Sequence, residues 1–344
     1  MWVSVHGDRE MNEKWFQRSA VAALVSVIFL IFVGAIVRVT GSGMGCPDWP
    51  TCWGCWVPPT AAEQVDFSKL DIAKYQRKAE RMGRDPATIT AETLKKEFNP
   101  RHVWTEYINR LCSLPVGFFT LVTFILSFWH REKKPEVFWA SFAALILVLI
   151  NGWMGARVVY SGLAPGVLTL HMAMAFLLIG VQTYIAWSSA SKPWAIDLMK
   201  IEEGRGMKFL LGLLVFCVLV EGVMGSQVRE LTDQMSKHKI IARSEWGPQL
   251  EASWLYLTHR SFSWVILVLT ILAAAKAKKF QVGGLHRPAL GVIGIVFAQM
   301  LLGLVMSQIH VFGVVQVLHV GLAAILYVLI LLWMMGLRGA EARA

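Results

Sequence analysis

The stretch Trp104–Ser113, WTEYINRLCS, decides how the rest of the chain is interpreted, because it places polar groups where a long apolar run begins. Its glutamate, Glu106, lies three residues before an asparagine, Asn109. Residues three apart lie on one face of a helix, so these two side chains face the same side. A second stretch, Tyr256–Ser263 (YLTHRSFS), opens another apolar run in nearly the same way, with His259 in place of the asparagine. The sequence therefore contains two related helix starts that differ at one position.

The composition predicts a membrane protein. The chain has 344 residues, of which 56% are hydrophobic and only 16% are charged, too few for a soluble domain of this size. A helix needs about 20 apolar residues to cross a bilayer. Eight runs meet this length, at about 19–39, 107–128, 137–159, 166–187, 208–228, 254–275, 289–309 and 313–335. We expect an all-α integral membrane protein with eight transmembrane helices.

The distribution of charge predicts the orientation in the membrane. The net charge is +10, and the basic residues gather in short loops such as 130–134 (HREKK), 192–208 and 276–287. Positively charged loops remain in the cytoplasm, so this pattern places both termini there and makes binding to nucleic acid an unnecessary explanation. Loops 40–106 and 229–253 then face outward.

Three cysteines fall in the first outward loop, in the segment CPDWPTCWGC. An oxidising compartment permits disulfides, but three cysteines form at most one internal pair. The sequence favours Cys46–Cys52 and leaves Cys46–Cys55 as the alternative. The rest of this loop, 60–105, is charged and is expected to contain helices at 66–82 and 90–98.

An internal repeat organises the eight runs. The odd-numbered runs end in a related pattern of a glycine, a small residue and a basic residue: Gly34–Arg38, Gly155–Val159, Gly225–Arg229 and, with losses, Met306–His310. Each following run carries one polar residue near its outer end: Asn109, His171, His259 and His319. The predicted unit is a helical hairpin repeated four times, which gives two similar four-helix bundles, 1–190 and 191–344. Small residues also favour close helix packing without any other function.

The recurring histidines are the candidate metal ligands. His171, His259 and His319 lie at one depth in the membrane, where a polar side chain is costly and usually functional. Neutral imidazoles facing each other across a bundle are typical axial ligands of haem iron. A zinc site would require carboxylate or thiolate partners at short spacing, which this pattern lacks.

Five arginines mark the outer boundary, where they can meet haem propionates or extend to lipid headgroups. They are Arg38, Arg110, Arg157, Arg229 and Arg260. Glu106 is the candidate catalytic acid or base, since a carboxylate beside a haem pocket can accept a proton or stabilise a developing cation. Glu221, inside the fifth run, is expected to pair with an arginine.

Five stretches together resemble the haem A synthase family: 33–54 (VGAIVRVTGSGMGCPDWPTCWG), 105–111 (TEYINRL), 168–175 (LTLHMAMA), 256–261 (YLTHRS) and 316–323 (QVLHVGLA). The resemblance extends over all eight runs. It implies an oxidoreductase of the bacterial cytoplasmic membrane, with sites towards the outer face, that converts the C8 methyl of haem O to the formyl of haem A for cytochrome oxidase. A haem O synthase would deliver the substrate.

The resemblance also implies residue roles. The C-terminal half would hold haem b between His259 and His319 and pass electrons. The N-terminal half would hold the substrate haem with His171 and act on it with Glu106. The family's outward disulfide would be Cys46–Cys52.

This chain departs from the family pattern at Asn109, where the commoner motif has a histidine. We hypothesise that the substrate haem is held by His171 on one side only, with Asn109 near the open face; His102 is the alternative ligand. Two other functions fit the residues, a di-haem b electron-transfer cytochrome and a haem carrier without turnover. The electron acceptor is not indicated by the sequence.

Overall fold

The computed structural model describes residues 2–81, 85–164, 166–190, 196–197, 201–237, 246–280 and 286–338. Within these ranges, eight helices are long and apolar enough to cross a membrane, as the sequence predicts. They are α1 (Trp2–Val39), α4 (Pro100–Ser127), α5 (Pro135–Tyr160), α6 (Val167–Ser188), α7 (Ile201–Lys237), α9 (Trp254–Phe280), α10 (His286–Gln308) and α11 (Gly313–Gly336). The predicted all-α membrane fold is confirmed.

Several helices extend beyond the apolar runs that predict them. α1 begins at Trp2 rather than near residue 19, and α7 continues to Lys237, where the sequence predicts a loop from residue 229. The start of α4 is fixed by Asn99, whose side chain accepts hydrogen bonds from the first backbone N–H groups, and by Pro100, which needs no partner there. Polar helix ends therefore project past the apolar segments at both sides of the membrane.

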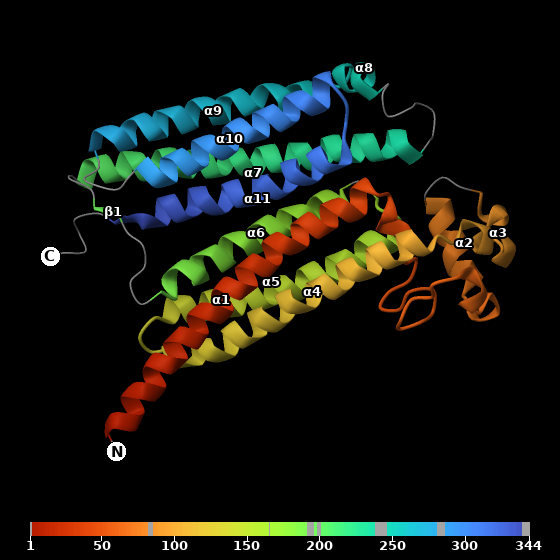
Figure 1. Ribbon diagram of the computed structural model, residues 1–344, viewed down its shortest axis with the longest axis horizontal. Coiled ribbons are helices and arrows are strands. Elements are labelled where there is room, and N and C mark those ends of the chain that lie inside the picture. The colour runs from red at the N-terminus through yellow and green to blue at the C-terminus, as the bar shows by residue number, and fades with distance from the viewer. Residues whose placement is uncertain are drawn as a thin grey trace.

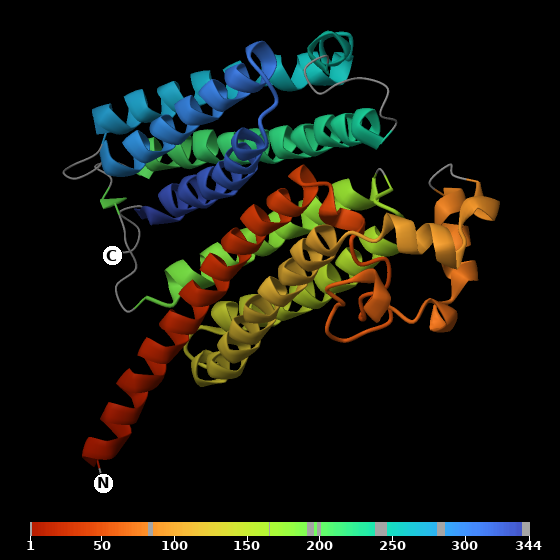
Figure 2. The same ribbon diagram turned by 45° about the vertical axis from the view of Figure 1, so that its right-hand side comes forward.

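The eight long helices pack as two groups of four (Figure 1). In the first group, α1 contacts α4, α4 contacts α5, α5 contacts α6, and α6 returns to α1. In the second, α7, α9, α10 and α11 make the same circuit in the same chain order. Figure 2 shows the two groups side by side, with α1 and α6 of the first next to α7 and α11 of the second.

The contact between the groups is apolar over most of its length. Phe176 of α6 packs edge-on against Tyr327 of α11, with ring centroids 5.5 Å apart. Gly180 and Gly222 allow this packing, because a Cβ at Gly180 would lie 2.9 Å from the Tyr327 hydroxyl and one at Gly222 would lie 3.2 Å from Phe176. Close backbone approach at small residues is how membrane helices associate tightly.

The segment between α1 and α4 forms a small cap at one end of the first group (Figure 1). It contains α2 (Ile72–Arg81), α3 (Ala91–Glu97) and four 3-10 turns at Ser42–Met44, Ala62–Gln64, Phe67–Lys69 and Pro86–Thr88. The two predicted helices of this segment are thus present, although shorter than predicted. Trp53, Tyr75 and Leu94 belong to its own apolar core, where burial raises the pKa of the Tyr75 phenol and keeps it neutral.

The other short elements complete the chain. The segment after α7 contains α8 (Trp246–Glu251), while residues 238–245 of that predicted loop lie outside the described residues. A 3-10 turn, Phe128–His130, follows α4. Two-residue strands β1 (Ile196–Asp197) and β2 (Leu337–Arg338) pair in parallel beside the end of α11, at the opposite end from the cap (Figure 1).

Candidate functional site

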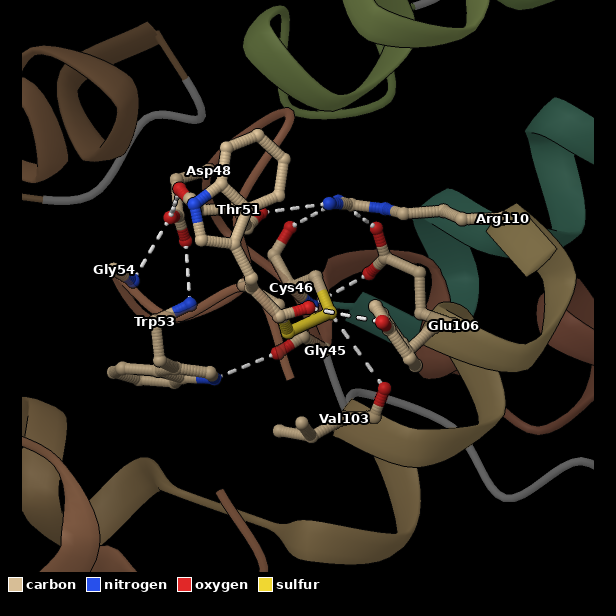
Figure 3. Close-up of a disulfide and its surroundings, with 12 residues drawn as sticks. Gly45, Cys46, Asp48, Thr51, Trp53, Gly54, Val103, Glu106 and Arg110 are labelled. Atoms are coloured by element: carbon tan, nitrogen blue, oxygen red, sulfur yellow. Dashed lines mark hydrogen bonds and ion pairs between the residues drawn. A yellow bond between two sulfur atoms is a disulfide. The ribbon is translucent and has the colours of Figure 1, made fainter. Parts of the chain in front are cut away.

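Glu106 lies in the second turn of α4 and is almost fully buried, with 4% of the residue exposed. Arg110, one turn further along α4, donates to its Oε1 at 2.7 Å, and the backbone N–H of Cys46 donates to its Oε2 at 2.7 Å. The same guanidinium donates to the carbonyls of Thr51 at 2.8 Å and Cys46 at 3.0 Å (Figure 3). These contacts hold the Glu106 carboxylate between its own helix and the loop that follows α1, with a donor on each of its two oxygens.

The loop reaches Glu106 because its backbone touches α4. A Cβ at Gly45 would lie 2.2 Å from the carbonyl oxygen of His102, so only glycine allows this approach. The indole N–H of Trp53 donates to the Gly45 carbonyl at 2.8 Å. These contacts place the backbone N–H of Cys46 next to the carboxylate (Figure 3).

A tight turn fixes the same loop from the other side. Cys52 and Cys55 exchange backbone hydrogen bonds, at 2.8 and 3.2 Å, across Trp53 and Gly54. Both central residues have positive φ, 55° and 75°, as a two-residue hairpin turn of this type requires. Asp48 stabilises the turn, since its carboxylate accepts from the backbone N–H of Trp53 at 2.7 Å and of Gly54 at 2.9 Å.

The disulfide joins Cys46 to Cys52, and Cys55 is a free thiol. The first of the two pairings that the cysteine spacing allows is thus confirmed. Both bonded cysteines are fully buried beneath the turn. The bond closes the loop directly at the residue whose N–H holds Glu106.

The four hairpins show one recurring contact. In each, a glycine of the first helix faces the polar residue of the second, so that a Cβ built on the glycine would lie 3.3–3.9 Å from that side chain. The four pairs are Gly34 with Asn109, Gly155 with His171, Gly225 with His259 and Gly303 with His319. The glycines leave space beside three imidazoles and one amide at the same place in each hairpin.

The fourth pair corrects the predicted register of the repeat. The pattern at the helix ends aligns Met306 with the three glycines, but Gly303, one turn earlier, is the residue that faces His319. The contact with the partner helix, rather than the basic residue at the helix end, is what the repeat preserves.

The polar atoms at these positions lack partners in the described part of the chain. Oδ1 of Asn109 and Nδ1 of His171, His259 and His319 are buried without a hydrogen bond. Buried polar atoms usually have partners, so these four atoms are available to a bound group. All four residues lie beside a glycine.

The spacing of the C-terminal histidines fits two ligands of one metal ion. The ring centroids of His259 and His319 are 6.4 Å apart. A ligating imidazole nitrogen lies about 2 Å from its metal and the ring centre about 1 Å behind it, so two rings on opposite sides of one ion would have centres about 6 Å apart. The distance between the two rings is therefore compatible with both histidines holding one haem iron.

The five candidate arginines occupy different surroundings. Arg38 donates to Asp233 of α7 at 2.6 Å, and Arg229 contacts the same carboxylate at 2.9 Å. Arg110 is engaged with Glu106 and the loop, as described above. Arg260 lies 3.8 Å from Glu251 on the surface, and Arg157 is exposed. A role of any of them towards propionates stays a prediction.

Two residues were missed or misassigned from the sequence. Asp233, four residues after Arg229, joins Arg38 of one half to Arg229 of the other, and the spacing of four was the only available signal. Glu221 was expected to pair with an arginine, which is wrong: its Oε1 lies 3.2 Å from Nδ1 of His259. Both residues contact a residue of another helix, Asp233 a residue of α1 and Glu221 a residue of α9.

Comparison with known proteins identifies the family of the chain. Residues 17–331 match the COX15-CtaA family model, described as cytochrome oxidase assembly protein. The chain belongs to this family. Among curated relatives, it is 25% identical to the Heme A synthase of Brucella anthropi, over 94% of this chain and 90% of the relative. It is also 25% identical to the Heme A synthase of Brucella ovis, over 86% and 83%. The resemblance to haem A synthase drawn from the motifs is thereby confirmed.

Proposed function

We propose that this protein oxidises the C8 methyl of haem O to the formyl of haem A at its outward end. The observation that carries the proposal is the buried Glu106, fixed by Arg110 and Cys46 in the same hairpin end as Asn109. In the other half, the paired His259 and His319 fit a resident haem b. One half would thus carry a reactive acid and the other a fixed redox cofactor.

The reaction has a definite balance. When water supplies the oxygen, the methyl carbon gains one oxygen atom and releases four protons and four electrons. Haem b, when bound, supplies one-electron transfer towards an acceptor at the membrane. The residues of the chain must therefore bind the substrate, take up protons near the methyl group and hold the electron carrier in place.

Glu106 would be the proton acceptor and the counter-charge. Its two oxygens accept hydrogen bonds from Arg110 and Cys46, yet a carboxylate has further lone pairs for a proton from the substrate. A positioned acid or base of this kind contributes about 10²–10⁴-fold to a rate. The contacts from both helix and loop keep the carboxylate from rotating away.

His171 and Asn109 would define the two faces of the substrate haem. An amide oxygen is a weak ligand for iron, so His171 would bind on one side and Asn109 would leave the other side open. Substrate haem must also leave after reaction, which single-sided ligation allows. Arg38, Arg157 and Arg229 would receive propionates, since guanidinium groups suit carboxylates.

Pigment analysis of cells that express this chain with a haem O synthase tests the proposal. We expect haem A to appear, and the purified protein to contain haem b. Accumulation of haem O alone, with haem b bound, would favour a di-haem electron-transfer cytochrome. Haem bound at substoichiometric levels without any product would favour a carrier.

A further inference from the structure

The residue four positions before each repeat glycine lies one helical turn deeper on the same face of its helix. In the four hairpins these residues are Leu30, Asn151, Glu221 and Gln299. Three of the four are polar inside membrane-spanning helices, where polar side chains are costly. Their common place in the repeat turns each of them towards the helix that carries the polar residue of its hairpin.

The three polar residues reach that partner differently. Asn151 donates to the backbone carbonyl of Met174 at 3.3 Å, and Gln299 donates to the backbone carbonyl of His319 at 2.7 Å. Glu221 alone approaches an imidazole ring, with Oε1 at 3.2 Å from Nδ1 of His259. Only the C-terminal half therefore places a carboxylate against a candidate ligand.

The contact between Glu221 and His259 is sheltered. Their side chains are 16% and 19% exposed, and among the described residues no arginine or lysine pairs with Glu221. A buried carboxylate is expensive unless a donor satisfies it, and the ring N–H is the donor at hand. The ring N–H is not aligned on Oε1 in this rotamer. The second torsion of an imidazole has a broad distribution, so the ring can turn towards a carboxylate that is 3.2 Å away.

We infer that Glu221 is a positioning residue for His259: it accepts the Nδ1–H, fixes the tautomer and leaves Nε2 for the haem iron. This inference rests on the proposed function. Ligating histidines usually donate their other N–H to a carboxylate or carbonyl, which orients the ring and makes the ligand more basic. A more basic ligand stabilises the oxidised iron, so Glu221 lowers the reduction potential of haem b.

The inference also explains why the two haem b ligands are unlike. Gln299 holds the backbone of His319 rather than its ring, and Nδ1 of His319 is buried without a partner in the described chain. Under this inference His259, which has a carboxylate beside its ring, is the more basic of the two ligands. In the first hairpin the equivalent residue is Leu30, whose apolar side chain cannot accept a hydrogen bond from the residue facing it. This agrees with the hypothesis that Asn109 is not a strong ligand.

The test is the midpoint potential of haem b in purified full-length protein, measured with the electron paramagnetic resonance spectrum of its oxidised form. Glu221→Gln keeps an acceptor oxygen and removes the charge, so the potential should rise. Glu221→Leu, which copies Leu30, should raise it further and weaken haem b binding about 10- to 100-fold. Asn151→Leu is the matched control and should leave both readouts of haem b unchanged.

The outcomes separate this inference from the proposed function. If His259→Ala and His319→Ala leave the haem b spectrum intact, the ligand assignment fails, and the inference with it. If those variants lose haem b but both Glu221 variants retain the wild-type potential and resonance spectrum, Glu221 has only a packing role and the inference alone is overturned. Should Glu221→Leu not fold, Glu221→Gln decides the matter.

Discussion

The hairpins α1–α4 and α7–α9 share their glycine contact but carry an acid on opposite helices. In the first, Glu106 lies on α4, three residues before Asn109. In α9 the equivalent place, three residues before His259, is taken by Tyr256. The acid that contacts His259 in this second hairpin is Glu221, on α7, where the first hairpin has Leu30. The two hairpins therefore share the contact between a glycine and a polar side chain, but they differ in the position of the acid beside it.

Glu106 and Tyr256, which occupy equivalent places in the two hairpins, also have different surroundings. Glu106 sits under a polar loop that donates hydrogen bonds to it. Tyr256 is buried in an apolar cluster with Trp246 and Leu250 of α8 and Val311. The outer end of the first hairpin is thus built to hold a charge, whereas that of the second is closed by hydrophobic side chains.

The comparison shows what each acid can reach. A carboxylate on the helix that bears the ligand, one turn outward, is held beside the place where a substrate would lie. A carboxylate on the facing helix, one turn inward, contacts His259 itself and, under our proposal, would tune the metal that this histidine holds. Under the proposed function, a difference in the position of one acid would separate a reactive site from an electron-transfer site in two otherwise similar hairpins.

The largest expected effect comes from removing the acid of the first hairpin. Glu106→Gln should lower haem A formation about 10²–10⁴-fold, because the proton acceptor is lost while the shape is kept. The ratio of haem A to haem O in extracted pigments measures this. Glu251→Gln, which alters an exposed carboxylate in the second half, is the control and should retain wild-type product. Normal haem A formation by the Glu106 variant would refute the assignment.

Replacing Asn109 by the histidine that the second hairpin has at this place tests the difference between the two hairpins directly. Asn109→His should place a ligand on the open face of the substrate haem, convert its iron to the six-coordinate low-spin form and slow product formation at least about tenfold. Absorption spectra of the substrate-loaded protein report this change. His102→Ala should leave the substrate haem bound. An unchanged spectrum in the first variant, or loss of this haem in the second, would end the single-ligand hypothesis.

The stability of the protein should also depend on Asp233, which joins the two halves through Arg38 and Arg229. Asp233→Asn leaves Arg38 and Arg229 without their shared carboxylate, and these side chains are 15–23% exposed. Loss of one partner of a buried ion pair costs about 3–5 kcal/mol, so a partly exposed one should cost about 1–3 kcal/mol of unfolding free energy. Thermal unfolding in detergent measures it. Asp71→Asn breaks an exposed 3.9 Å pair with Arg77 and should have no measurable effect; equal effects of both variants would contradict the bridging role.

Much of this arrangement could be predicted from local sequence patterns. Hydropathy and helix length are local properties, so the eight spans and the shared depth of His171, His259 and His319 could be inferred from the sequence. The spacing of Glu106 and Arg110 on one helix likewise allows their contact. The sequence favours the Cys46–Cys52 disulfide over Cys46–Cys55, and the structure contains Cys46–Cys52.

What the sequence could not provide were contacts between remote segments. The N–H of Cys46 meets Glu106 only because Gly45 lets the loop touch α4, and 60 residues separate the two partners. Arg38 and Asp233 are 195 residues apart. The predicted register of α10 is wrong because the sequence pattern aligns Met306 at the helix end with the other glycines, whereas Gly303 is the residue that faces His319. Periodicity defines the face of a helix, whereas packing decides which neighbour that face meets.

The smallest expected effect distinguishes the glycines of the two hairpins. A Cβ at Gly225 would lie 3.3 Å from the His259 ring, whereas one at Gly34 would lie 3.9 Å from Asn109, an ordinary contact. Gly225→Ala should therefore displace the ring by a few tenths of an ångström and lower haem b content several-fold, while Gly34→Ala should leave it unchanged. Alanine favours a helix over glycine by about 1 kcal/mol, so neither variant should fold less well. Haem b content per protein measures the difference, and equal content in the two variants would show that the glycine beside His259 does not shape the ligand's position.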